Sequence, residues 1–337
     1  MKLSDLKYDY PEELIALVPS RPTRVMWIDK KNKNKAQELT IDNLIEKIPA
    51  GDVLVINDTQ VLRRRIFTAD GLEILFLDQD QKNGQNQNWN VLFPSKKYKI
   101  GDVIELPQGF KMTLLEKGLP QKVSVTPDIF EKDFEKIGEL PLPPYIQKAR
   151  NIRHNVETDK TWYQTAWAEN PGSYAAPTAS LHFSEKNIDS LISKGVIVVK
   201  ITLHVGLGTF LPVKVEDLDQ HKMHSEIYNV DQKSWNIILD AHKNQRGIWA
   251  MGTTVTRTLE TVIRNNILSG ESDILLQVGS EFKIVNRLIT NFHQPESTLL
   301  ALVAGFSDLD TVKKSYAWAI ENRFKLFSYG DLSIWLK

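Results

Sequence analysis

Three of the seven histidines of this chain lie close together in one segment. His204 directly follows an apolar run, and His221 and His224 come soon after it. An imidazole can accept or donate a proton near neutral pH, so this cluster could carry general acid–base chemistry. Gly206 and Gly208 stand in the same segment, and glycine allows a backbone to approach a ligand closely. The segment predicts a functional site, although surface histidines beside structural glycines would give the same pattern.

Four apolar runs are predicted to be strands that carry such polar segments at their ends. The run 196–203 is β-branched and apolar nearly throughout, which favours a strand buried on both faces. The other runs are 53–56, 248–251 and 283–289, and the segments after the four strands read HVGLGT, NDT, GTT and NFHQPES. If the strands are parallel neighbours, these segments meet at the carboxyl edge of one sheet, where α/β proteins bind ligands. That edge would gather Asp58, His182, His204, Thr253, Asn291 and His293.

The spacing of the remaining elements predicts two domains. The chain has 337 residues, which is too many for one simple core. Short apolar runs without intervening helices predict a small antiparallel β-barrel in residues 68–147, with a polar hairpin tip at 79–88 and a closing helix at 127–136. We therefore expect an α/β main domain of residues 1–67 and 148–337 with this barrel inserted; an independent N-terminal domain is the alternative. Helices of the main domain are expected at 41–48, 184–194, 232–243, 256–265, 298–306 and 309–321.

The composition excludes several classes of protein and site. The chain has no cysteine, so it has no disulfides, thiolate metal sites or cysteine nucleophiles, which fits a cytoplasmic protein. No apolar run is long enough to span a bilayer, and the N-terminus does not read as a secretory signal. Lys plus Arg and Asp plus Glu are 42 each, so a nucleic acid would have to bind a local basic patch. The candidate patches are Arg63–Arg65 and Lys96, Lys97 and Lys99.

Standard catalytic and metal motifs are missing from the sequence. It contains no GxGxxG, P-loop, HExxH or GxSxG pattern. His221, His224 and Glu226 could bind a metal, but their spacing matches no standard site. We therefore predict no metal.

Eight long motifs nevertheless resemble one family, the S-adenosylmethionine:tRNA ribosyltransferase-isomerases of queuosine biosynthesis. In chain order they are KLSDLKYDYPEELIA, GDVLVINDTQVL, GELPLPPYI, YQTAWAENPGSYAAPTASLHF, ITLHVGLGTFLPV, HKMHSE, LITNFHQPESTLLALVAGF and RFKLFSYGD. The resemblance runs over almost the whole chain and implies an α/β body with an inserted β-barrel. The chain departs from the usual family pattern at Gln60, Arg63, Arg64, GTTVTRT (252–258), Gln294, Glu296 and residues 272–280, which touch possible substrate walls.

The resemblance also implies a reaction. The ribosyl part of S-adenosylmethionine, the co-substrate, is moved onto the aminomethyl group of a 7-deazaguanine at the anticodon of tRNA. It is rearranged to an epoxycyclopentane, and adenine and methionine leave. The sulfonium acidifies the neighbouring 5′ carbon, so a general base is needed there, and the departing adenine needs a proton or a strong hydrogen bond. No metal and no obligate protein partner are implied.

Candidate residues follow from the predicted sheet edge together with the resemblance. The catalytic candidates are His204, His182, Asp58 and His293. The candidates for substrate binding are Asn57, Thr59, Arg65, Thr178, Gly206, Gly208, Thr209, His224, Glu226, Thr253, Thr254, Arg257 and Asn291. Two alternatives remain, a non-catalytic tRNA- or nucleotide-binding paralogue and a methyltransferase that uses the same cofactor. The four catalytic candidates together favour catalysis, and the absence of a glycine-rich loop after a first strand weighs against the methyltransferase.

Overall fold

The computed structural model describes residues 1–80, 87–206, 208 and 213–337, and its chain separates into two compact units. The first unit consists of Met1–Gln60, Pro143–Ile152 and Thr161–Lys337, and the second of Val61–Leu142 and Arg153–Lys160. Each unit has hydrophobic clusters of its own. The two units are therefore described separately.

A nine-stranded mixed sheet forms the centre of the first unit, in the order β15-β13-β12-β3-β14-β16-β17-β1-β2. Its strands are β1 (Arg24–Asp29), β2 (Gln37–Thr40), β3 (Val53–Asn57), β12 (Ile197–Leu203), β13 (Glu226–Asn229), β14 (Ile248–Met251), β15 (Ser269–Ser272), β16 (Arg287–Asn291) and β17 (Leu332–Leu336). Neighbours β12, β3, β14 and β16 are parallel, while β17 runs antiparallel to β16. The expected α/β class is confirmed, and the four strands do end at one edge.

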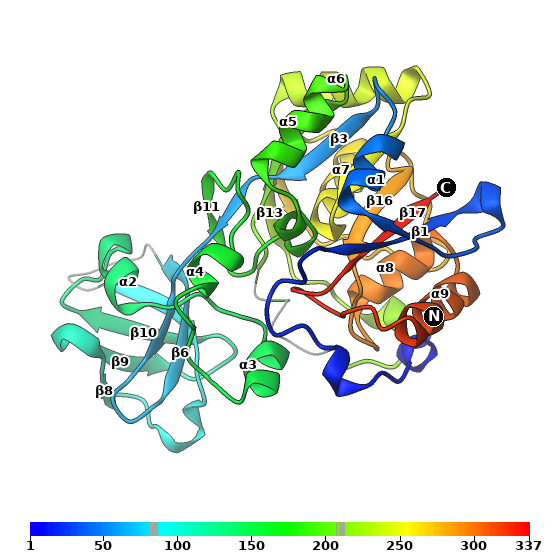
Figure 1. Ribbon diagram of the computed structural model, residues 1–337. Coiled ribbons are helices and arrows are strands. Elements are labelled where there is room, and N and C mark those ends of the chain that lie inside the picture. Colours follow the sequence, from blue (N-terminus) through cyan, green and yellow to red (C-terminus); the bar gives the residue numbers. More distant parts are fainter. Residues whose placement is uncertain (81–86, 207, 209–212) are drawn as a thin grey trace. The chain divides into compact units, whose positions relative to one another are not determined.

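Helices cover both faces of this sheet, because each face is apolar. Side chains of β3 alternate between two clusters, with Val53 and Val55 in one and Leu54 and Ile56 in the other. The first cluster includes residues of α6 (Gln232–Lys243), α7 (Thr253–Asn265), α8 (Thr298–Phe306) and α9 (Leu309–Glu321). The second includes residues of α1 (Ile41–Lys47) and α5 (Glu185–Ser193). Figure 1 shows α6 and α7 in yellow-green and yellow, and α8 and α9 in orange to red.

The short elements of the main body are α3 (Pro144–Arg150), β11 (Asn170–Ser173) and the 3-10 turn η6 (Thr178–His182). Along the chain, β4 (Thr59–Val61) and α4 (Asp159–Trp162) each include residues of both units. Hydroxyl caps begin two helices where the sequence predicts them. Thr40 accepts a hydrogen bond from the backbone of Asn43, and Ser184 accepts one from Asn187.

Two predicted boundaries and one predicted burial pattern in this unit are wrong. Strand β16 begins at Arg287 rather than at residue 283, because the buried carboxylate of Glu260 binds the backbone N–H groups of residues 283–285. Helix α7 begins three residues early, directly after Gly252, whose φ is +101°. Strand β12 is not buried on both faces throughout, since Ile197 and Lys200 are exposed.

The second unit is built on a six-stranded antiparallel sheet, in the order β5-β6-β7-β10-β9-β8. Its elements are β5 (Arg65–Phe67), β6 (Glu73–Asp80), β7 (Gln87–Leu92), β8 (Val103–Glu105), β9 (Lys111–Glu116), β10 (Gln121–Thr126) and α2 (Glu131–Ile137). The antiparallel sheet agrees with the expectation, but α2 begins four residues later than the predicted helix. Among the described residues, β5 and β8 are the ends of a curled, open sheet, so a closed barrel is not what these pairings form. The predicted hairpin tip falls mostly on residues 81–86, outside the described part of the chain.

Three aromatic rings bind α2 to its sheet. Phe76 and Trp89 pack edge-to-face at 5.7 Å between centroids, and Phe134 of α2 lies 5.2 and 5.5 Å from them. Such pairs add stability beyond their buried area.

The two ends of the segment that forms this sheet lie next to each other. The backbones of Arg65 and Glu139 exchange hydrogen bonds of 3.2 and 2.7 Å.

Candidate active site

The carboxyl edge of the main sheet brings together most of the candidate residues. Asp58 and Thr59 follow β3, His204 follows β12, Thr253 begins the helix after β14, and His293 follows β16. Because these four strands are parallel and adjacent, their ends lie in a row. The polar segments that were predicted to meet at the carboxyl edge therefore lie next to one another in the structure.

Asn57 ties the ends of two strands to the start of a helix. Its carboxamide Nδ2 donates to the carbonyl of Leu203 at 3.0 Å, and its Oδ1 accepts from the N–H groups of Leu203 and Thr59, both at 3.1 Å. Nδ2 also lies 3.4 Å from Oγ1 of Thr254. The side chain is fully buried, so its hydrogen bonds fix the geometry of β3 and β12 at the edge.

His204 is held from three sides. Its backbone N–H donates to the carbonyl of Ile227 at 2.9 Å, and its Nδ1 lies 2.8 Å from Oγ1 of Thr59. A Cβ on Gly172 would lie 2.7 Å from ring atoms of His204, so the imidazole packs directly on glycine backbone. Partial burial lowers the pKa of His204, and the negative charge of Asp58 opposes this shift. The ring is therefore neutral at pH 7.

Asp58 is fixed by hydrogen bonds and nearly inaccessible. Its Oδ1 accepts from the hydroxyl of Thr202 at 2.7 Å, and that hydroxyl oxygen accepts from Nδ2 of Asn170 at 3.2 Å. Its backbone carbonyl accepts from the N–H groups of Glu169 and Asn170. The side chain is 6% exposed. A carboxylate held in this way supplies a stationary negative charge beside His204.

His182 has both ring nitrogens engaged inside the protein. The hydroxyl of Thr23 donates to the carbonyl of Ser20 at 2.9 Å, so its oxygen accepts from Nδ1–H of His182 at 3.2 Å. Nε2 then accepts from Nδ2 of Asn291 at 2.9 Å. Burial, and to a lesser extent the charge of Arg21, lower the pKa of His182 to about 3. This imidazole is neutral and has one fixed tautomer.

Thr178 belongs to the same buried network, and His293 has buried hydrogen bonds of its own. The hydroxyl of Thr178 donates to Oδ1 of Asn291 at 2.8 Å. The ring Nε2 of His293 lies 2.8 Å from Oγ1 of Thr290, and burial lowers the pKa of His293 to about 3. The backbone of His293 is bound by the hydroxyls of Tyr316 and Tyr8 at 3.0 and 2.5 Å. His293 is thus a second neutral imidazole.

A buried ion pair stands beside the histidine segment. Nη1 of Arg257 donates to Oε2 of Glu226, and the other oxygen of Glu226 accepts from the N–H of Gly206 at 3.2 Å. Both side chains are 6% exposed. Nε and Nη2 of Arg257 are buried and have no hydrogen-bond partner among the residues that the structure describes.

Other candidates lie outside this constellation. His224 is exposed, and its Cβ is 2.9 Å from where a Cβ of Gly208 would stand. Thr209 lies outside the described residues. No cluster of three or more His, Asp or Glu side chains that could hold a metal occurs among the residues described.

The arginines that follow β4 are engaged within the second unit. Arg65 is 2% exposed and bridges Glu139 and Glu73 at 3.1 and 3.7 Å. These carboxylate partners explain why Arg65 is buried. Both of them belong to the second unit and not to the carboxyl edge of the main sheet. Arg63 and Arg64 pair with Glu135 and Glu131. Lys96, Lys97 and Lys99 are exposed instead.

Sequence reasoning missed three residues that position the candidates. Gly172 stands inside the quoted motif YQTAWAENPGSYAAPTASLHF, and its place directly after Pro171 could have marked it as a turn. Thr202 is the second-last residue of the predicted strand. Its place near the carboxyl end of that strand could have marked it as a neighbour of the site. Thr23 gives no local signal, because its partner His182 is far away in the sequence.

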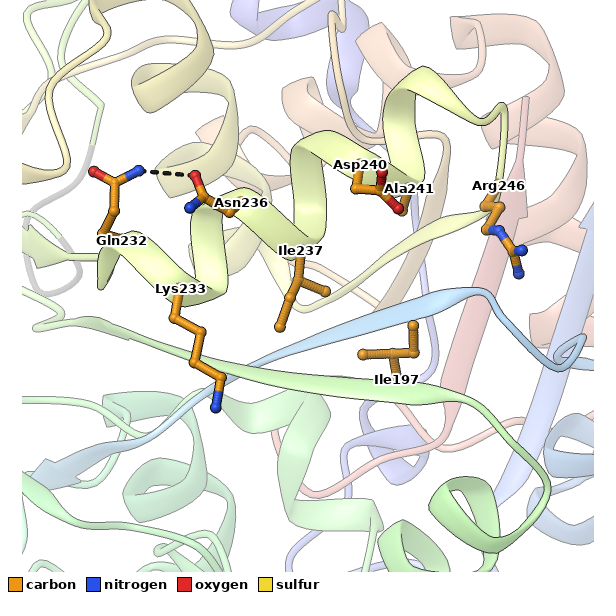
Figure 2. A pocket seen from close by; sticks show the side chains of 8 residues that line it. All are labelled: Ile197, Gln232, Lys233, Asn236, Ile237, Asp240, Ala241 and Arg246. Atoms are coloured by element: carbon orange, nitrogen blue, oxygen red, sulfur yellow. Dashed lines mark hydrogen bonds between the residues drawn. The ribbon is translucent and has the colours of Figure 1, made fainter.

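A separate groove runs along α6 and contains none of the candidates. Figure 2 shows its lining, and its volume is about 770 Å³. The lining residues are Ile197, Gln232, Lys233, Asn236, Ile237, Asp240, Ala241 and Arg246. The groove thus follows a helix face rather than the carboxyl edge.

No helix in the described parts of the chain is both long and apolar enough to cross a membrane.

The comparisons with known proteins cover nearly the whole length of the chain. A profile of the family described as "Queuosine biosynthesis protein" matches residues 3–334.

Two relatives carry the name S-adenosylmethionine:tRNA ribosyltransferase-isomerase. The protein of Sulfurihydrogenibium sp. strain YO3AOP1 is 38% identical, with 98% of each chain covered, and that of Finegoldia magna is 39% identical, with 98% of this chain and 97% of the relative covered. A crystal structure of the S-adenosylmethionine tRNA ribosyltransferase from Thermotoga maritima is 28% identical, with a TM-score of 0.56 over 98% of this chain and 99% of that one. The chain therefore belongs to the queuosine biosynthesis protein family.

Proposed function

We propose that this chain is an S-adenosylmethionine:tRNA ribosyltransferase-isomerase. It transfers the ribosyl moiety of S-adenosylmethionine to the aminomethyl group of 7-aminomethyl-7-deazaguanine at the anticodon of tRNA and isomerises it. The products are epoxyqueuosine in tRNA, adenine and methionine. The family profile and the names of relatives that are 36–39% identical over 98% of the chain support this function over methyl transfer or binding alone.

The observation that carries the mechanism is the environment of His204. An imidazole must be unprotonated to act as a general base, and burial lowers the pKa of His204. With Nδ1–H donating to Thr59 at 2.8 Å, Nε2 keeps its lone pair for the proton on the carbon next to the sulfonium. Asp58 then stabilises the imidazolium that forms, as a carboxylate does beside a catalytic histidine.

His182 and His293 have different roles in this proposal. Both are buried and neutral, and their ring nitrogens already contact Thr23, Asn291 and Thr290. We assign them to positioning of the edge. The departing adenine would take a hydrogen bond from polar groups of this edge, where Thr253 and Thr254 carry hydroxyl groups; the hydroxyl of Thr178 is already engaged with Asn291.

In this proposal the second unit contacts the tRNA. The exposed lysines Lys96, Lys97 and Lys99 of the second unit are suited to phosphates, because among the described residues none of them forms a salt bridge, whereas Arg63 and Arg64 do. We propose that residues 68–147 act as an inserted barrel-like module, supported by the paired backbones of Arg65 and Glu139. A tRNA substrate also implies a cytoplasmic location. No metal is needed, because a sulfonium is a good leaving group.

Product analysis tests the proposed function. The purified chain is incubated with S-adenosylmethionine and tRNA that carries the 7-aminomethyl-7-deazaguanine precursor. We expect adenine and methionine in equal amounts, and a matching incubation with unmodified tRNA should give neither. S-adenosylhomocysteine would indicate methyl transfer instead, and tRNA binding without turnover would indicate a binding protein.

A further inference from the structure

The guanidinium of Arg257 is used on one side only. Nη1 holds the carboxylate of Glu226, whereas Nε and Nη2 are buried and have no hydrogen-bond partner in the described part of the chain. Burying N–H donors without an acceptor costs free energy, and the cost is larger when the group is charged. The side chain is 6% exposed, so it is a buried cation, and the two unpaired nitrogens carry three of its five N–H donors.

The two unpaired atoms have a specific geometry. Nη2 is the terminal nitrogen that shares an edge with Nε, so their N–H bonds point the same way in the guanidinium plane. This edge matches the two oxygens of a carboxylate or of a phosphate. Glu226 cannot fill it, because its Oε2 is bound to Nη1 and its Oε1 accepts from Gly206. The edge is therefore suited to an anion from outside the protein.

The place of Arg257 in the fold joins this edge to the candidate active site. Arg257 is the fifth residue of α7, and long side chains of a helix point back toward its N-terminus. The N-cap of this 13-residue helix is Gly252, which offers no side-chain cap, so the positive end of the helix dipole favours an anion here. Glu226 directly precedes Ile227, whose carbonyl binds the backbone of His204.

We propose that the unpaired edge of Arg257 binds the carboxylate of the methionine part of S-adenosylmethionine. This inference rests on the proposed function. The carboxylate is the only anionic group of that co-substrate, and its binding beside His204 would place the sulfonium end toward the base. Glu226 acts as a positioning residue, because it holds Nη1 and so turns the Nε–Nη2 edge away from itself.

The test compares S-adenosylmethionine with its decarboxylated form by calorimetry in the absence of RNA. We expect the unaltered chain to bind the carboxylate form about 10- to 100-fold more tightly, as a charge-assisted hydrogen-bonded pair allows. Arg257→Lys keeps a cation for Glu226 but loses the planar edge, so most of this ratio should disappear. Arg264→Lys, on the same helix and paired with Glu260, is the matched control and should keep the ratio.

Several outcomes would overturn the proposal. Equal affinity of the unaltered chain for the two compounds would do so without any variant. An unchanged ratio in folded Arg257→Lys would show that the edge holds only water. If Arg257→Lys binds tRNA more weakly but binds S-adenosylmethionine normally, the edge would be assigned to an RNA phosphate. Adenine release by the unaltered chain separates these failures from a failure of the proposed function, which would abolish release altogether.

Discussion

The imidazole of His204 packs on the backbone of Gly172 so closely that a Cβ there would lie 2.7 Å from ring atoms Cε1 and Nδ1. On the hydrogen-bonding side, Thr59 holds Nδ1 at 2.8 Å. The ring is thus placed between a glycine and a hydroxyl, and a base in this position needs no reorganisation before it accepts a proton.

Gly172→Ala should therefore displace the ring of His204. We expect adenine release to fall about 10- to 100-fold, since misplacement of a catalytic group by around 1 Å has effects of this size. The melting temperature should also fall, because alanine is strained at the positive φ of Gly172 (+157°). Gly279→Ala controls for this strain, because its φ is also positive (+94°) while a Cβ there meets nothing within 4 Å. Full activity in Gly172→Ala would show that the position of the ring does not matter.

The buried histidines predict a loss of stability in acid. Burial lowers the pKa values of His182 and His293 to about 3, whereas an unfolded histidine titrates near ~6.5. Between these values the unfolded state binds more protons than the folded state, so the free energy of unfolding decreases as pH falls. Each histidine should contribute a slope of about 1.4 kcal/mol per pH unit.

Chemical denaturation at several pH values between 7 and 4 measures this slope. In His293→Gln one of the two histidines is lost, and the slope should decrease by about 1.4 kcal/mol per unit relative to the unaltered chain. His242→Gln, a change on the last turn of α6, should leave it as it was. The same slope in all three chains would mean that His293 is protonated in the folded state.

Contacts of the second unit with RNA are predicted to depend on exposed lysines. A triple Lys96, Lys97 and Lys99 to alanine variant should lower the salt dependence of tRNA binding, by nearly three units in slope if all three contact phosphates. Fluorescence anisotropy at several salt concentrations gives this slope.

A triple alanine variant at Lys30, Lys31 and Lys33 removes the same charge elsewhere. These lysines are also exposed, but they lie in the main body, and we expect a nearly unchanged slope. If both triple variants give equal slopes, the lysines of the second unit have no special role in RNA binding.

The second unit should be removable. Neither hydrophobic cluster of the main body includes a residue between 68 and 136, and the backbones of Arg65 and Glu139 are paired. Replacing residues 68–136 with a short Gly/Ser linker should leave a main body that unfolds cooperatively, as followed by circular dichroism. A variant with the same linker inserted at Gly109, with nothing removed, controls for the linker. A main body that does not fold would show that the second unit is part of its core.

The sequence predicted the row of strand ends, because apolar runs followed by polar segments depend on local patterns. It could not predict which polar groups bind each other. The carboxylate of Glu260 takes the place of strand pairing at residues 283–285, and Thr23 fixes the tautomer of His182 from 159 residues away. Such contacts depend on how distant segments pack, so His182 reads as an acid–base candidate until its partners are known.

The single-turnover release of adenine by His204→Ala tests the central claim most directly. The chain is mixed in excess with S-adenosylmethionine and precursor-carrying tRNA, and the rate is normalised to folded protein by circular dichroism. We predict a loss of about two to four orders of magnitude, with nearly unchanged binding of S-adenosylmethionine, because only the proton transfer is removed. A loss of less than about fivefold, together with a lower melting temperature, would contradict the account and make His204 a packing residue.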